Sequence, residues 1–333
     1  MKIHAIAALT AMVLTATITS CDGHKAATFE YPPVHVADIY RSMADYAGAD
    51  SAARAAILAT DTTELAAFCR VVSDGAPSAD AVELWSRSLP VAIFTPTVDS
   101  VYASTDTLAQ NIGTILGRAA AAGIELPERR YAAVVYGRHE SVLFVDSVML
   151  IALNHYLGQE YPGYSHWPVY MRFNKAPQYM PYDIAEALVA TEFPYSGGDN
   201  ATVLSRMLYE GALTAAKLEL VGEDAEPVYA LGYRPEQYRF LTDEEGNLWR
   251  TAVGHRLIFD TSAATASQLV DVSPATRLLD ERAPGRAGRF LGWRIVESYR
   301  RAHPEATLPF LLSPEFYNSP DVLTQAGYSP ANS

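Results

Sequence analysis

Two glutamates on neighbouring helical patterns are the residues of this sequence whose types and spacing could do metal chemistry. Glu186 lies in the pattern over residues 182–193, and Glu210 lies in the pattern over residues 203–220. Zinc-dependent peptidases hold their metal with a His-Glu-x-x-His helix and often take a further ligand from a second helix. The order of these segments therefore indicates a metal centre, provided that the remaining ligands are present.

The metal ligands themselves are missing from this layout. No His-Glu-x-x-His occurs in the chain, and with Glu186 placed at the glutamate of that motif the two ligand positions are Ala185 and Val189. Neither side chain carries a donor atom, and one carboxylate does not hold zinc. The pattern predicts a core-facing helix with Glu186 on its solvated side, and a buried hydrogen-bonding role for Glu210. We therefore expect no metal site and no cofactor.

Two enzymatic or binding alternatives remain open beside this expectation. A zinc metallopeptidase with non-standard ligands would need both glutamates together with a loop histidine, such as His155 or His166. A glycan-handling surface lipoprotein is suggested by the aromatic-rich loop over residues 161–182, because aromatic faces can stack on sugars. Bound zinc would favour the first alternative, and glycan binding that is lost on substitution of Trp167 would favour the second.

The first twenty residues predict the cellular compartment. They hold one lysine and a mostly apolar run that is too short to span a bilayer, and they end in small residues immediately before Cys21. This is the form of a bacterial lipoprotein signal peptide, after which the cysteine becomes the lipidated N-terminus. We predict a signal peptide over 1–20, lipidation of Cys21 and a tether over 21–33. The protein would then be anchored in the cell envelope, on the periplasmic side or in the outer membrane.

The charge balance and the cysteine count exclude several classes of function. The chain carries 25 Lys and Arg against 38 Asp and Glu, a net charge of −13, and no basic stripe interrupts this acidic composition. Nucleic-acid binding is therefore not expected. Cys21 and Cys69 are the only cysteines, so lipidation of the first leaves the second without a disulfide partner. A disulfide scaffold and a thiolate zinc site are both excluded.

The periodicity of apolar residues predicts an α+β fold that is mostly α, with a small central sheet. Strands are expected at 131–137 and 147–153, joined by a connection through 138–145, and the segment 89–104 is expected to be a loop or a short strand. A single domain over 34–333 is expected, with a mainly helical part up to residue 130 and the sheet and C-terminal helices after it. Helices are predicted at 36–46, 51–74, 79–88, 108–123, 182–193, 203–220, 227–231, 235–240, 247–259, 288–302 and 306–311.

Several short words of the sequence resemble one family of lipoproteins. They are SVMLIALNHYLGQEYPGY, YMPYDIAEAL, LGYRPEQ, DEEGNLWR, APGRAGRFLGWRIVESYRRAHP and SPEFYNSP, which together run from residue 147 to residue 320. In these words the chain is similar to the gliding-motility-associated lipoproteins of the GldB type, which are found in the Bacteroidota, and Cys21 fits their lipidated start. The resemblance covers roughly residues 131 to 330.

The resemblance implies a zincin-like domain with a degenerate metal site. The GldB-like family is itself similar to predicted zinc peptidases, and its members have generally lost the histidine pair. Ala185, Glu186, Val189 and Glu210 would then be vestigial active-site positions in a catalytically inactive scaffold. The implied role is binding of a ligand or of an envelope protein partner, with the membrane contacted through the N-terminal lipid.

The glycine-rich word that contains Arg286 also has an interpretation from its residues alone. Gly285 and Gly288 allow a tight turn ahead of a helix, and Gly292 permits the close approach of another element. Arg286 lies in an otherwise apolar setting, and so does Glu210. We therefore expect Arg286 to be the partner of a buried acid such as Glu210.

Overall fold

The structure is a computed structural model that describes residues 31–73, 78–198 and 201–330. The predicted signal peptide, Cys21 and most of the predicted tether lie outside these residues. Within them, no helix has the length and the apolar composition that a membrane span requires.

A four-stranded mixed sheet lies at the centre of the fold in the order β1-β2-β4-β3. Strands β1 (Val36–Asp38), β2 (Arg130–Val134) and β4 (Val148–Ala152) run parallel, and β3 (Val142–Val145) pairs antiparallel with β4. The sequence predicts β2 and β4 but not the outer strands. Residues 36–38 were expected to begin a helix, and residues 142–145 to form a connection. Both become edge strands because pairing with a distant neighbour overrides the local pattern.

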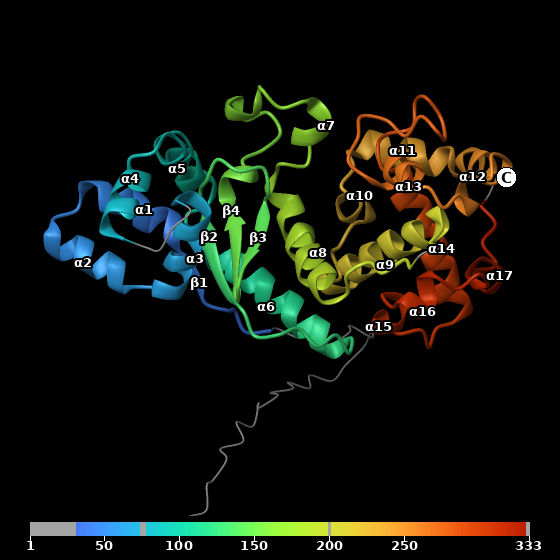
Figure 1. Cartoon of the computed structure of the whole chain (residues 1–333), viewed down its shortest axis with the longest axis horizontal. Coiled ribbons are helices and arrows are strands. Elements are labelled where there is room, and N and C mark those ends of the chain that lie inside the picture. Colours follow the sequence, from blue (N-terminus) through green and yellow to red (C-terminus); the bar gives the residue numbers. More distant parts are fainter. Residues whose placement is uncertain (1–30, 74–77, 199–200, 331–333) are drawn as a thin grey trace, which may run out of the picture. The chain divides into compact units, whose positions relative to one another are not determined.

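Helices cover both faces of this sheet (Figure 1). Successive strand residues point to opposite faces, so that Tyr131 and Ala133 join one apolar cluster while Ala132 and Val134 join another. The first helices of the chain pack on the second cluster, and the helices after residue 105 pack on the first. The sheet is therefore buried on both faces, as its continuous apolar strands require.

The N-terminal helices are α1 (Ile39–Gly48), α2 (Ser51–Ala59), α3 (Thr62–Ser73), α4 (Ala79–Ser86), α5 (Leu89–Val101) and α6 (Asp106–Ala121). The predicted helix over 51–74 is divided in two because Asp61 has a left-handed φ of 46°. The expectation of a loop or strand at 89–104 is wrong, since this segment is α5. Pro90 occupies its first turn, where no backbone N–H is needed, and Pro96 is tolerated inside the helix.

The segment that enters the fold lies along α6. The backbone N–H of Val34 donates to the Ala109 carbonyl at 3.2 Å, and the Gln110 side chain donates to the Tyr31 carbonyl at 2.7 Å. A Cβ at position 117 would lie 1.9 Å from the Tyr31 ring, so a larger residue there would displace that ring. The last residues of the predicted tether are thus held against a helix.

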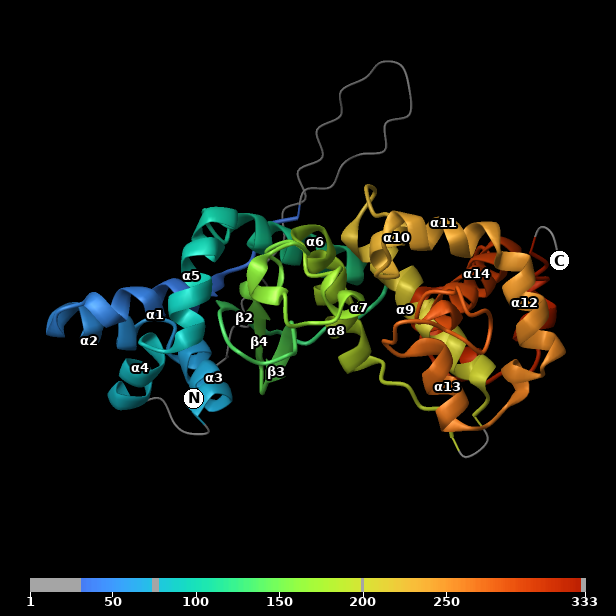
Figure 2. The ribbon, with the colours of Figure 1, turned by 90° about the horizontal axis from the view of Figure 1, so that it is seen from above.

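The C-terminal part is almost entirely helical and is organised around one long buried helix, α9 (Val203–Val221). Figure 2 shows α13 and α14 beside α9, and α8 also packs against it. An α+β fold that is mostly α is therefore confirmed. The other elements are α7 (Val169–Arg172), α8 (Met180–Glu192), α10 (Pro227–Ala230), α11 (Pro235–Asp243), α12 (Glu245–Gly254), α13 (Ala263–Val270), α14 (Ala287–Ala302), α15 (Leu308–Leu311), α16 (Pro314–Tyr317), α17 (Val322–Ala326) and the short 3₁₀ turns at Leu153–His155, Pro162–Tyr164, Pro177–Tyr179 and Leu257–Phe259.

Helices α9 and α14 touch backbone to backbone at a pair of glycines. A Cβ on Gly211 would lie 2.4 Å from the Gly292 carbonyl, and a Cβ on Gly292 would lie 1.8 Å from the Met207 carbonyl oxygen. The predicted role of Gly292 in a close approach is therefore confirmed. The contact also brings Glu210, which precedes Gly211, to Arg289, which lies one turn before Gly292.

Candidate functional site

Polar side chains gather where the parallel strands β2 and β4 end. Both strands finish at the same edge of the sheet, which is where open sheets with parallel strands bind ligands. Asn154, which follows β4, is hydrogen-bonded to the segment that follows β2. Its Oδ1 accepts from the Tyr136 backbone N–H at 3.3 Å, and its Nδ2 donates to the Tyr136 carbonyl at 2.9 Å. The edge is thus fixed by side-chain hydrogen bonds, and the residues that follow are held in place.

A chain of hydrogen bonds leads from this edge to α8. The Lys175 ammonium donates to Ser141 Oγ at 2.5 Å, and His155 Nδ1 lies 3.3 Å from the same oxygen. The Tyr156 hydroxyl donates to Asp183 Oδ2 at 2.7 Å. Burial and the charge of Lys175 lower the pKa of His155 to about 3, whereas burial raises the pKa of Asp183. His155 is therefore neutral at pH 7, and Asp183 resists ionisation.

An ion-pair centre lies beyond Asp183, between α8, α9 and α14. Glu186 pairs with Lys217 at 2.5 Å and with Arg289 at 3.4 Å. Glu210, which is 3% exposed, pairs with Arg206 at 2.7 Å and with Arg289 at 3.2 Å. Burial opposes ionisation of Glu186, but the charges of Lys217 and Arg289 prevail and lower its pKa to about 2. The Arg289 guanidinium thus bridges the carboxylates of Glu186 and Glu210.

The predicted pair of Arg286 and Glu210 does not form. Arg286 has a left-handed φ of 66° just before α14, and its guanidinium donates to the Gly232 carbonyl at 2.5 Å and lies over the Tyr233 ring at 5.7 Å. Arg289 lies one turn inside the helix, on the side that touches α9, and therefore takes the place predicted for Arg286. The predicted burial and hydrogen bonding of Glu210 agree with its exposure of 3% and with its ion pairs to Arg206 and Arg289.

Ala185 and Val189 do not face the ion-pair centre. Both are fully buried in the apolar core, and at 100° per residue they lie on the side of α8 opposite to Asp183. Asp183 and Glu186 are three residues apart and share the polar side. The sequence interpretation did not single out Asp183, although an acid pair at this spacing could have indicated it. Lys217 was not singled out either, although it lies seven residues after Glu210 and therefore on the same face of α9.

The residues of the ion-pair centre do not fit a zinc ion. Arg289 binds oxygens of both Glu186 and Glu210, and a cation cannot share that position with a guanidinium. Among the residues described, no group of three or more His, Cys, Asp or Glu side chains is arranged to hold a metal ion. His155 contacts Ser141 and Trp167, and His166 packs on Trp167, so the proposed loop ligands lie with the aromatic loop.

A pocket of about 160 Å³ opens beside the Lys175 end of the hydrogen-bonded chain. Its walls come from the aromatic loop, from α7 and from the segments before α14, and they include His139, Trp167, Tyr170, Lys175, Val272 and Arg286. The aromatic loop packs on itself here, because Trp167 stacks on Tyr164 with ring centroids 5.3 Å apart. The Lys175 ammonium also lies over the Trp167 ring, at 5.6 Å.

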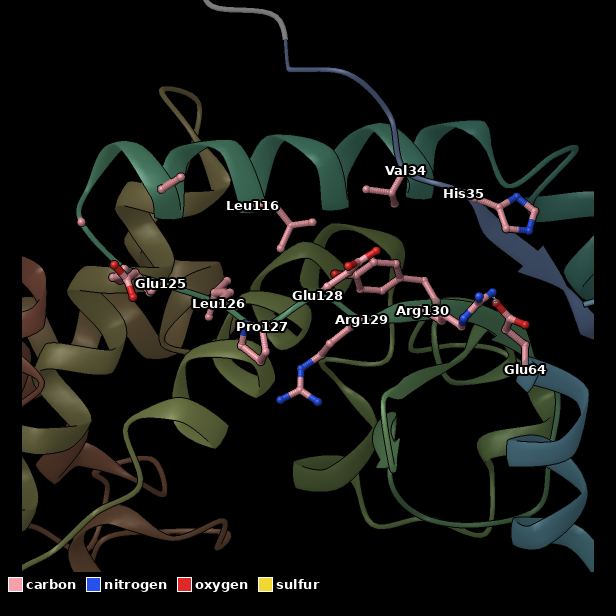
Figure 3. Close-up of a pocket in the computed structure, with 14 residues that line it drawn as sticks. Val34, His35, Glu64, Leu116, Glu125, Leu126, Pro127, Glu128, Arg129 and Arg130 are labelled. Carbon is pink, nitrogen blue, oxygen red and sulfur yellow. Dashed lines mark hydrogen bonds and ion pairs between the residues drawn. The ribbon is translucent and has the colours of Figure 1, made fainter. Parts of the chain in front are cut away.

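A larger cavity of about 810 Å³ lies at the opposite edge of the sheet, where β2 begins (Figure 3). It runs between α6 and residues 123–131, with His35, Glu64 and Arg130 at one end of the view. Its basic side chains have acidic partners: Arg130 pairs with Glu64 at 3.2 Å, and Arg129 pairs with Glu192 at 2.6 Å. The basic charges on its walls are therefore already compensated, in contrast to those of the smaller pocket.

Comparison with known families gives one match, to a family described as gliding motility protein GldB, over residues 33–330. The match covers nearly the whole of the described chain, including the sheet, the aromatic loop and the ion-pair centre. No curated protein and no solved structure matches the chain.

Proposed function

Because the chain belongs to the family of gliding motility protein GldB, we propose that it is a lipid-anchored cell-envelope protein without catalytic activity, acting by binding a partner or a ligand. The family is one of lipoproteins, which is consistent with a location in the cell envelope. Anchoring would occur through Cys21, which follows the predicted signal peptide.

The observation that carries the proposal is the bridging position of Arg289. In a zinc peptidase, the side chains at this place would leave lone pairs free for a metal that activates water. Here the guanidinium supplies both the positive charge and the hydrogen-bond donors between Glu186 and Glu210. Lys217 supplies a second cation to Glu186. Such a centre stabilises the packing of three helices and offers no position for an activated water.

The descent of this site from a peptidase is supported by the order of its elements. An antiparallel edge strand, β3, lies beside α8, and α8 is followed by a second helix that carries Glu210. If Glu186 takes the second histidine position of His-Glu-x-x-His, the same spacing puts Tyr182 at the first histidine and Asp183 at the glutamate. In this frame Asp183 and Glu186 share the polar side of α8, whereas Ala185 and Val189 are buried in the apolar core. We propose this frame as the vestigial motif.

Metal content of the purified domain, residues 22–333, tests the proposal. After mild chelation and re-addition of zinc, we expect less than stoichiometric zinc in the wild-type protein, and the same result for Glu210→Ala. Glu219→Ala is the matched control, because Glu219 lies on the same helix but pairs with Arg300. Stoichiometric zinc that is retained by the wild type and by Glu219→Ala but lost in Glu210→Ala would overturn the proposal and establish a metallopeptidase-like centre.

A further inference from the structure

The small pocket beside the aromatic loop is lined by two cations, Lys175 and Arg286, that form no ion pair within the described part of the chain. The Lys175 ammonium donates a hydrogen bond to the neutral Ser141 hydroxyl, and the Arg286 guanidinium donates one to the Gly232 carbonyl. Neither forms an ion pair with a carboxylate of the described residues. The neighbouring Lys217 and Arg289 both do. The pocket and the ion-pair centre therefore differ in how their charges are compensated.

Partial burial makes these two charges costly in the free protein. Desolvation lowers the pKa of Lys175, and it lowers the pKa of Arg286 as well, with the charge of Arg289 adding to the effect. A desolvated cation without a counter-charge is unfavourable, and proteins compensate such charges with pairing groups or ligands. The part of each side chain that remains exposed lines the pocket. An anion in the pocket would therefore lie next to both Lys175 and Arg286.

The acids that face these cations cannot supply the missing charge. Asp183 attracts Lys175, but it is bound by Tyr156 and burial raises its pKa. Glu186 attracts Arg286, but Lys217 and Arg289 already hold its oxygens. The connected cluster holds five cations against three acids, an excess of positive charge within a chain whose net charge is −13. Its cations are Lys175, Arg206, Lys217, Arg286 and Arg289, and its acids are Asp183, Glu186 and Glu210.

Arg286 is held in place before any ligand arrives. Its left-handed backbone conformation is uncommon for a residue with a side chain, and such strain concentrates at functional sites. Its guanidinium is fixed by the Gly232 carbonyl and by the Tyr233 ring. Gly232 is itself left-handed, and a Cβ there would approach the guanidinium to 3.0 Å. The Tyr233 hydroxyl is buried next to this group and has no hydrogen-bond partner among the described residues.

We propose that this pocket binds a carboxylate that carries an apolar group, as at the C-terminal residue of a partner polypeptide. Lys175 and Arg286 would bind the carboxylate, and Trp167, Tyr170 and Val272 would cover the apolar group. Val272 is 56% exposed and gains most from being covered. A volume of about 160 Å³ suits one terminal residue, since pockets for whole drug-sized ligands measure about 300–1,000 Å³. This inference rests on the proposed binding function and names its ligand class.

Binding of N-acetyl-leucine to residues 22–333, compared with its uncharged match N-acetyl-leucinamide, tests the carboxylate requirement. Titration followed by NMR should give at least tenfold tighter binding of the acid. Arg286→Gln and Lys175→Met should each weaken binding of the acid at least tenfold. Arg282→Gln is the control, because Arg282 is exposed and pairs with Asp280, and it should leave binding unchanged. Circular dichroism of each variant verifies that the fold is retained, and Lys175→Gln replaces Lys175→Met if the latter does not fold.

Four further probes identify the source of the carboxylate. A pentapeptide that ends in leucine should bind when its C-terminus is free and should not bind as its C-terminal amide. A pentapeptide amide with an internal glutamate should bind at least tenfold more weakly than the peptide with the free C-terminus. Inorganic phosphate should compete only weakly. Equal affinity for acid and amide, no binding of either, or tighter binding of phosphate would overturn the inference. These results are independent of the zinc content, which tests the non-catalytic scaffold separately.

Discussion

Arg286 and Arg289 are three residues apart and have opposite surroundings. Arg289 lies between two carboxylates, from Glu186 and Glu210, whereas Arg286 is bound by a neutral carbonyl and borders a pocket. The same contrast holds between Lys217, which pairs with Glu186, and Lys175, which is bound to a hydroxyl. Charges that the protein compensates itself hold its helices together. Charges that it leaves uncompensated are the ones that we propose for ligand binding.

Backbone geometry produces this difference. The glycine contact between α9 and α14 brings Arg289 within reach of Glu210. The left-handed conformation of Arg286 ends the preceding segment and turns its side chain towards Gly232. Two neighbouring arginines are thus directed to different sides of the α14 N-terminus.

The largest effect is expected when the bridging cation is removed. Arg289→Met leaves the carboxylates of Glu186 and Glu210 close together, and loss of one partner from a buried ion pair costs about 3–5 kcal/mol. Arg286→Met removes a hydrogen bond to a carbonyl and should cost about 1 kcal/mol. Urea unfolding of both variants measures the difference. If the two variants lose equal stability, the distinction between a compensated and an uncompensated arginine is wrong.

Acidification should weaken the ion-pair centre in a defined pH range. The folded-state pKa of Glu186, about 2, lies below its ordinary value of 4.5, so the unfolded chain binds more protons between these values and stability falls as the pH drops through them. His155 has a folded pKa of about 3 against an ordinary 6.5, so its own loss begins at a higher pH. Thermal unfolding of His155→Gln should be less pH-dependent from pH 6.5 down to about 3, with the part of the loss below pH 4.5 that Glu186 causes retained. If the pH dependence of stability between pH 6.5 and 4.5 is the same in this variant as in the wild type, the assignment of that loss to His155 is wrong.

A smaller effect is expected from widening the helix contact that positions Arg289. In Gly292→Ala the added Cβ would lie 1.8 Å from the Met207 carbonyl oxygen, so the helices must separate, at a cost of about 1–3 kcal/mol. Gly254→Ala is the matched control, because no atom lies within 4 Å of a Cβ there and the change should be neutral or slightly stabilising. Chemical denaturation of both variants gives the comparison. Equal stability would show that the contact can relax without loss.

The parts of the fold that local patterns determine were predictable from the sequence. The mostly helical class, strands β2 and β4 and the long helices follow from apolar periodicity. Strands β1 and β3 were missed, because three or four residues become a strand only through pairing with β2 or β4. The Pro-containing segment of α5 was missed because its prolines suggest a loop when their position within the helical turns is unknown.

The candidate site was predictable only in part. Glu186 and Glu210 were singled out by their spacing, and Gly292 by its setting between larger residues. Arg289 was missed in favour of Arg286, since the left-handed turn that separates their directions leaves no pattern in the sequence. The pocket joins Lys175 to Arg286 across more than one hundred residues. No local periodicity relates such positions.

The way the chain enters the fold has a mechanical consequence. Tyr31 and Val34 are hydrogen-bonded to α6, and β1 pairs with β2 immediately afterwards. Tension applied at Tyr31 is therefore borne first by α6 and then by the edge of the sheet. The pocket lies at the end of the sheet where β2 and β4 finish. The ion-pair centre lies beyond it, between α8, α9 and α14. Because neither the pocket nor the ion-pair centre includes residues of this entering segment, a load at Tyr31 would not act on their side chains directly.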